Sequence, residues 1–302
     1  MEKKINLLVL HPRVSSKNAK KALNLFKNGL IKEKVDARFV DFEEVEVFLN
    51  NGEVEVLFGE FNLNEVENIF FRKVGFNKDL AFLISTLADR KDINFTDKLY
   101  ARFYDSTKLT QTFLFHMENI SAPKTYFSPV YDKRKLFKAA DFLGVPFIVK
   151  ECNSSQGKGV SLIENKNQIE EKLKSFSGKQ IILQEFIKND FEYRVLVTGS
   201  EVAVVEKKIR DKNSNEFRNN VHLGAQEEFL DISSVDKSMK DLALKAADIL
   251  GIQIAGVDVI EDLKGNRFIT EVNSNPSFTY NESVSNEISK LISFLKKWIG
   301  KE

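Results

Sequence analysis

This chain of 302 residues contains few cysteines and histidines, and its net charge is close to zero. The single cysteine, Cys152, excludes a framework of disulfides within the chain. The three histidines, His11, His116 and His222, are scattered and match no zinc-binding spacing. Because 45 lysines and arginines face 44 acidic residues, the formal net charge is only +1. That balance gives no general attraction to nucleic acid or membranes, and we expect neither as a partner.

Long apolar runs are also missing. No run approaches the ~18 apolar residues that a membrane-spanning helix needs. The apolar stretch within residues 1–10 is too short for a signal peptide, so we expect a cytoplasmic protein. A chain of 302 residues is long enough to form two or three lobes with sizeable cores.

Helix and strand patterns alternate along the chain, as is typical of stacked α/β lobes. Residues 5–10 form an apolar strand pattern, and apolar residues at helical spacing follow at 19–30. The stretches 35–40 and 66–71 extend the same predicted sheet. Residues 288–299 predict a final helix that buries one apolar face.

Two strand-like runs late in the chain carry oxygen ligands. Asp258 lies within an apolar run, whereas Glu271 and Asn273 are two apart on the next run, so both side chains leave one face ~7 Å apart. If residues 263–266 form the loop of a hairpin, Asp258 lies opposite Glu271 and all three share that face. Two carboxylates and one amide suit Mg²⁺ that is shared with nucleotide phosphates. The alternative is a surface strand with solvated acids, which the apolar neighbours of Asp258 disfavour.

A second candidate site follows an apolar run that ends at Lys150. The next residues are rich in Ser, Gln and Gly and include Gly157-Lys158-Gly159, whose backbone amides can fold over phosphates. No Walker A pattern exists, and the glycine pair alone also suits an ordinary hairpin turn. Lys150 is more informative, because an ammonium at the end of an apolar run needs an anionic partner to offset desolvation.

In order and spacing, these segments resemble the ATP-grasp superfamily, and within it the RimK-like (alpha-L-glutamate ligase type) carboxylate-amine ligases. The matching segments are Asp105-Ser106-Thr107-Lys108 before a helix, Val149-Lys150 with the glycine stretch, Gln184-Glu185-Phe186-Ile187, Glu192-Tyr193-Arg194, residues 216–224, and the three oxygen ligands. The resemblance is clear from about Asp97 to Ser277.

The resemblance implies an α/β (α+β lobes) ATP-grasp fold in which two lobes clamp ATP. The implied divisions are an N-terminal α/β pre-ATP-grasp domain at 1–96, a central lobe with the glycine loop at 97–186, and a C-terminal lobe with the metal site at 187–302. RimK-like enzymes are often oligomers, so a homo-oligomer is also implied.

The resemblance also implies roles for individual residues. Nucleotide contacts fall on Lys108, Lys150, Gln156, Gly157, Gly159, Gln184, Glu185, Phe186, Glu192, Lys207 and Arg218. The implied metal ligands are Asp258, Glu271 and Asn273, and the implied metal is Mg²⁺ or Mn²⁺, with two ions bound. Catalytic roles fall on Lys150, Arg218 and Asn220, because phosphoryl transfer needs positive charge around the equatorial oxygens. Without the resemblance, an alternative stays open in which Glu185 and Glu192 are strand-surface acids and Arg194 simply pairs with Glu192.

We therefore expect an ATP-dependent carboxylate-amine ligase that forms an amide through an acylphosphate. It would add an amino acid such as glutamate to a small-molecule, peptide or protein carboxylate. Two alternatives remain: an ATP-grasp phosphotransferase, in which a hydroxyl receives the phosphoryl group, and a non-catalytic ATP-binding regulatory module. The chain departs from the family pattern at Leu223, Ala225 and Ser277, which lie on substrate-facing segments, so the acceptor and the added amino acid stay open.

Overall fold

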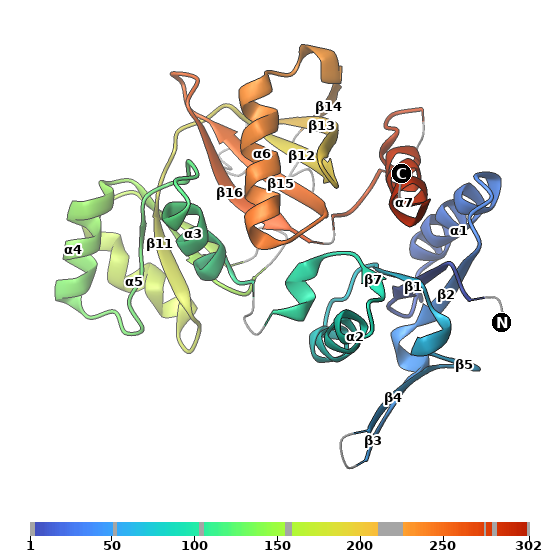
Figure 1. Ribbon diagram of the computed structural model, residues 1–302. Helices are drawn as coiled ribbons and strands as arrows, with labels where there is room; N and C mark the ends of the chain where they lie inside the picture. The colour runs from blue at the N-terminus through green and yellow to red at the C-terminus, as the bar shows by residue number, and fades with distance from the viewer. Residues whose placement is uncertain are drawn as a thin grey trace.

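The computed structural model describes residues 4–50, 53–102, 106–154, 159–210, 226–274, 276–279 and 283–300. The strands in these ranges form four sheets, and helices pack against them (Figure 1). Within them, no helix combines the length and the apolar character needed to cross a membrane.

The first sheet is parallel, with strand order β2-β1-β6-β7. Its strands are β1 (Leu7–His11), β2 (Ala37–Asp41), β6 (Asn68–Phe71) and β7 (Asn94–Phe95). Helix α1 (Lys17–Lys32) packs on one face and α2 (Lys78–Arg90) on the other. Because both faces are covered, all five residues of β1 are buried, as the apolar run that precedes His11 predicts. A small antiparallel sheet of β3 (Val45–Asn50), β4 (Glu53–Phe58) and β5 (Phe61–Asn62) projects from this part (Figure 1).

The second sheet is antiparallel, with strand order β10-β9-β11-β8. Its strands are β8 (Thr125–Tyr126), β9 (Phe147–Glu151), β10 (Val160–Ile163) and β11 (Ile181–Glu185). Helices α4 (Lys133–Leu143) and α5 (Ile169–Leu173) cover one face, where Phe147 and Val149 enter their core. Since side chains alternate along a strand, Ile148 and Lys150 point to the opposite face.

The third sheet has five antiparallel strands in the order β14-β13-β12-β15-β16. They are β12 (Phe191–Thr198), β13 (Glu201–Ile209), β14 (Gln226–Leu230), β15 (Ile254–Glu261) and β16 (Arg267–Asn273). Helices α3 (Lys108–Met117) and α6 (Lys237–Leu250) contribute to one core with Val195, Val257 and Val272 of this sheet. Side chains alternate along a strand, so Arg194, Asp258 and Glu271 point to the other face.

The last helix, α7 (Glu287–Gly300), packs against α1 and β1 near the start of the chain. Its residues Leu291, Ile292 and Leu295 share one core with α1 and β1 and with Leu196 and Ile254 of the five-stranded sheet. Figure 1 shows α7 beside α1. The predicted helix at 288–299 is confirmed within one residue at each end, and its apolar face fixes the first sheet against the third.

Candidate functional site

The hairpin of β15 and β16 places the predicted metal ligands together. Asp258 lies opposite Glu271, and Gly256 lies opposite Asn273, so all three side chains share one face. This confirms the predicted register, although the connecting turn is one residue longer than expected. Asp262 donates its N–H to the Asn266 carbonyl at 2.9 Å, and a bulge next to Asp258 restores the register.

Each of these three residues already has a polar partner. The Arg194 guanidinium donates two hydrogen bonds to Asp258, Nε to Oδ1 at 2.8 Å and Nη2 to Oδ2 at 2.9 Å. The Asn273 amide donates to Asp258 Oδ2 at 3.3 Å, and Lys108 Nζ lies 3.3 Å from Glu271 Oε1. Burial would raise the pKa of Asp258, but the Arg194 guanidinium outweighs it and holds that pKa below its ordinary value. The Asp258 carboxylate is therefore ionised at neutral pH.

The donor set fits a hard divalent cation. Throughout the described ranges, no three His, Cys, Asp or Glu side chains cluster as metal ligands. A cation at Asp258 and Glu271 would need the amide oxygen of Asn273 and further oxygens from phosphate or water. Mg²⁺ binds in this manner, through one or two carboxylates plus substrate phosphates.

A row of charges continues from this hairpin across the sheet. In register, Arg194 on β12 lies between Asp258 on β15 and Glu206 on β13, and Glu192 lies opposite Lys208. Lys208 Nζ is 3.8 Å from Glu206 Oε2, and both side chains are buried. Burial raises the pKa of Glu206 to about 7, and burial together with the charge of Asp258 raises the pKa of Glu192 to about 7.

Lys150 and Lys108 approach these acids from the second sheet and from α3. Burial lowers the pKa of Lys150 to about 8, and the charges of Glu271, Glu192 and Asp258 counteract this shift. Lys108 stands at the first position of α3 and donates to the Ser154 carbonyl as well as facing Glu271. Two lysines from different elements thus stand beside the candidate metal ligands, where phosphates need positive charge.

The predicted hinge contacts lie at and beyond the end of β11. Gln184 is buried and donates from Nε2 to Thr125 Oγ1 at 3.0 Å. The Glu185 carboxylate accepts the Lys124 backbone N–H at 3.2 Å and lies 3.7 Å from the Lys124 ammonium. The side chain of Glu185 is thus engaged by Lys124, and Phe186 directly follows the strand.

The structure does not bring Lys207 to the charged row. Its ammonium lies 4.0 Å from the ring of Phe191, on the face that α6 covers. Lys208 points to the acids instead. The reason is a bulge between Leu196 and Val197, which shifts the pairing of β12 and β13 by one residue. The turn alone would have set Lys207 opposite Glu192, so sequence reasoning missed Lys208.

Gly159 is the described member of the predicted glycine loop. Its φ of +66° is left-handed, and a Cβ there would lie 2.7 Å from Glu151 Oε2. The position therefore requires glycine. The other predicted residues Gln156, Gly157, Arg218 and Asn220 lie outside the described residues, as do Leu223 and Ala225.

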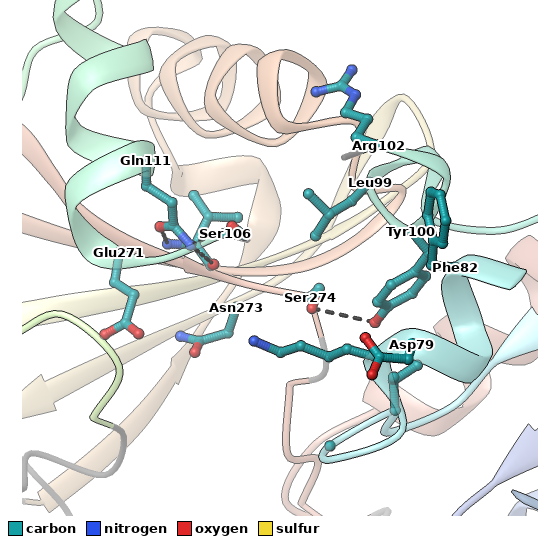
Figure 2. A pocket seen from close by; sticks show the side chains of 14 residues that line it. Asp79, Phe82, Leu99, Tyr100, Arg102, Ser106, Gln111, Glu271, Asn273 and Ser274 are labelled. Atoms are coloured by element: carbon teal, nitrogen blue, oxygen red, sulfur yellow. Dashed lines mark hydrogen bonds between the residues drawn. The ribbon is translucent and has the colours of Figure 1, made fainter. Parts of the chain in front are cut away.

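A cavity of about 470 Å³ adjoins the metal ligands. Figure 2 shows Glu271 and Asn273 on one side of it and Asp79, Phe82 and Tyr100 on the other. The Tyr100 hydroxyl donates to Ser274 Oγ at 3.4 Å, which connects the two sides. Lys78 and Arg102 also line it, so the wall offers both charge signs and an aromatic surface. Sequence reasoning did not find this pocket, because its residues come from segments far apart in the chain.

Gln111 holds one wall of the pocket in place. Its Nε2 donates to the Val272 carbonyl at 2.9 Å, and its Oε1 accepts the Val272 N–H at 2.9 Å. The two bonds tie α3 to β16 between Glu271 and Asn273. Lys108 on α3 and the two ligands on β16 are thus fixed relative to each other.

Comparison with known proteins adds family evidence to this geometry. A family model described as a RimK-like ATP-grasp domain matches residues 105–294. The probable alpha-L-glutamate ligase of Cellvibrio japonicus (strain Ueda107) is 34% identical over 184 residues, which cover 59% of this chain and 58% of that protein. The alpha-aminoadipate–LysW ligase LysX of Saccharolobus solfataricus is 30% identical over 203 residues, which cover 64% of this chain and 71% of that protein. This chain thus spans less than two thirds of the glutamate ligase relative.

Solved structures resemble nearly the whole chain. The ATP-grasp ligase PsnB complexed with a minimal precursor, Mg and ADP has a TM-score of 0.69 at 15% identity, and 98% of each chain is covered. A second neighbour is a RiPP-associated ATP-grasp ligase of Chryseobacterium gregarium in complex with ADP and a leader and core peptide. Its TM-score is 0.69 at 13% identity, and the match covers 98% of this chain and 97% of that chain. At such low identity the likeness shows the fold alone, and the expected ATP-grasp fold is confirmed.

Proposed function

The chain belongs to the RimK-like ATP-grasp family, and from this premise we propose that it is an ATP-dependent carboxylate-amine ligase. The observation that carries the proposal is the joint placement of Asp258, Glu271 and Asn273 beside Lys108 and Lys150. This arrangement supports binding of a metal–nucleotide pair rather than of a neutral ligand, because carboxylates that suit a metal lie beside ammonium groups that suit phosphates.

In the proposed reaction, Asp258, Glu271 and Asn273 would hold Mg²⁺ or Mn²⁺, two ions in all. Such ions would supply positive charge that offsets the charge of the ATP phosphates. Lys108 and Lys150 donate to the same phosphates, and Arg218 would add a further positive charge. The hinge after β11 and the half-buried side chain of Ile148, on the Lys150 face of the second sheet, offer a surface for the adenine ring.

The cavity beside Glu271 and Asn273 suits the carboxylate substrate. A carboxylate oxygen attacks the γ-phosphorus, the bond to the β-phosphate oxygen breaks, and ADP leaves. An amine then attacks the acyl carbon of the acylphosphate, phosphate departs with the C–O electron pair, and the amine loses a proton. The products are an amide, ADP and phosphate. Exclusion of water protects the acylphosphate, and Gly159 belongs to the loop that we assign to this task.

The substrates are proposed from the relatives. Several are named probable alpha-L-glutamate ligases and one joins alpha-aminoadipate to LysW, which supports an amino-acid amine such as that of glutamate. Solved neighbours hold precursor peptides, which supports a peptide or protein carboxylate alongside a small-molecule one. The mixed charges of the pocket wall suit either.

The test is turnover of Mg-ATP with a panel of amino acids and peptide carboxylates, followed by mass spectrometry. We expect ADP and phosphate in equal amounts and a product whose mass equals both substrates minus one water. ADP without phosphate release would indicate a phosphotransferase. ATP-dependent thermal stabilisation without turnover of any pair would indicate a non-catalytic binding module.

A further inference from the structure

Arg194 stands between two acids on neighbouring strands. It pairs in register with Asp258 on β15 and with Glu206 on β13. Side chains directly opposite on antiparallel strands have Cβ atoms roughly 4.5–5.5 Å apart, so the guanidinium can reach either carboxylate by rotating its side chain. Glu192, two residues away on the same strand, is farther, at roughly 7 Å along the chain.

Only one of the two acids is paired with Arg194. Both Asp258 oxygens accept from the guanidinium, at 2.8 Å and 2.9 Å. Glu206 is 7% exposed, and its Oε1 is buried without a hydrogen-bond partner in the part of the chain that the structure describes. The other oxygen, Oε2, lies 3.8 Å from Lys208 Nζ. The Glu206 carboxyl also faces Glu227 on β14, which adds to the rise of its pKa. A buried acceptor without a donor is costly, and Arg194 lies opposite Glu206 in register, so its guanidinium can supply the donor.

We propose that Arg194 is a positioning residue with two partners, holding Asp258 until a divalent cation binds and then pairing with Glu206. The inference rests on the proposed metal site at Asp258 and Glu271. Both Asp258 oxygens accept from Arg194, so a cation at Asp258 competes with the guanidinium for the same two oxygens. Two positive groups on one carboxylate also repel each other strongly in a site of low dielectric. Glu206 receives the displaced guanidinium within the same sheet face, which lowers the cost of metal entry.

Mn²⁺ binding in the presence of ADP tests the proposal without any need for turnover. Electron paramagnetic resonance measures free Mn²⁺ in titrations of the full chain, with Mn²⁺–ADP alone as the reference. Glu206→Gln keeps the size of the side chain but removes the charge that would receive Arg194. We expect Mn²⁺ to bind this variant more weakly, on the order of tenfold.

The matched control is Glu228→Gln. Glu228 lies on β14 opposite Lys207, whose side chain points away from the charged row. This variant loses the same charge from the same sheet, and its affinity for Mn²⁺ should equal that of the native chain. Equal affinities for all three proteins would overturn the role of Glu206, whereas absence of protein-bound Mn²⁺ in the native chain would overturn the metal site itself.

Arg194→Met separates coupling from a direct effect. Without the guanidinium there is nothing to move, so Glu206→Gln added to Arg194→Met should leave Mn²⁺ affinity unchanged. An equal loss in both backgrounds would show that Glu206 acts on the cation directly, contrary to the proposal. Circular dichroism monitors folding, and if Arg194→Met does not fold, the comparison of Glu206→Gln with Glu228→Gln decides alone.

Discussion

At the scale of single residues, the sequence predicts which side chains carry chemistry better than it predicts their partners. Asp258, Glu271 and Asn273 meet on one face because spacing along strands fixes their direction. Pairing of Arg194 with Glu192 was the simpler alternative, yet Arg194 holds Asp258, since a residue opposite on the next strand is nearer than one two places along. Cross-strand partners depend on tertiary register, which sequence spacing does not supply.

Lys150 offers a prediction at this scale. Burial lowers its pKa to about 8, so it is charged below that pH and neutral above it. If its ammonium binds phosphate, affinity for ATP should fall as the pH rises above about 8, by up to roughly tenfold per pH unit. Isothermal titration calorimetry between pH 6.5 and 9.5 measures this. Lys150→Arg stays charged throughout that range and should remove the decline. An unchanged decline in Lys150→Arg would assign the effect to another group.

At the scale of elements, periodicity predicts helices well and fails where two segments must pair. Helix α1 begins after Ser16, whose Oγ accepts the Ala19 N–H, and α6 ends at Leu250, directly before Gly251 with φ of +67°. Serine and glycine are the residue types that favour these cap positions. Helix α2 and the β3–β4 hairpin were not predicted. Bulges in β12 and in the β15–β16 hairpin each shift the register by one residue. One of them redirects Lys207 away from the site, and counting along the chain cannot reveal that.

Helix α7 offers a prediction at this scale. Leu295 is fully buried between the first sheet and the five-stranded sheet, so its truncation leaves a cavity at their junction. We expect Leu295→Ala to lower the free energy of unfolding by about 2–5 kcal/mol in urea titrations. Ile31 on α1 is 70% exposed, and Ile31→Ala should change that free energy by no more than about 0.5 kcal/mol. Similar losses in both variants would mean that α7 does not anchor the two sheets.

At the scale of the whole molecule, the fold brings distant segments to one place. Asp97, after β7, accepts the N–H groups of Gln253 and Ile254 at 2.8 Å and 3.1 Å and so fixes the start of β15. The cavity beside Glu271 depends on this docking, since α2 forms one side and β16 the other. The ATP-grasp fold could be predicted from ordered motifs, whereas the cavity could not, because it exists only after the first sheet packs on the third.

The most direct test of the proposed chemistry follows the oxygen atoms of the carboxylate substrate. Once the panel has identified a substrate pair, the carboxylate is labelled with ¹⁸O and the released phosphate is analysed by mass spectrometry. An acylphosphate forms through a carboxylate oxygen, so one labelled oxygen should appear in phosphate for each amide formed. Phosphate that carries no label, with product still formed, would contradict transfer of the γ-phosphoryl group to the carboxylate.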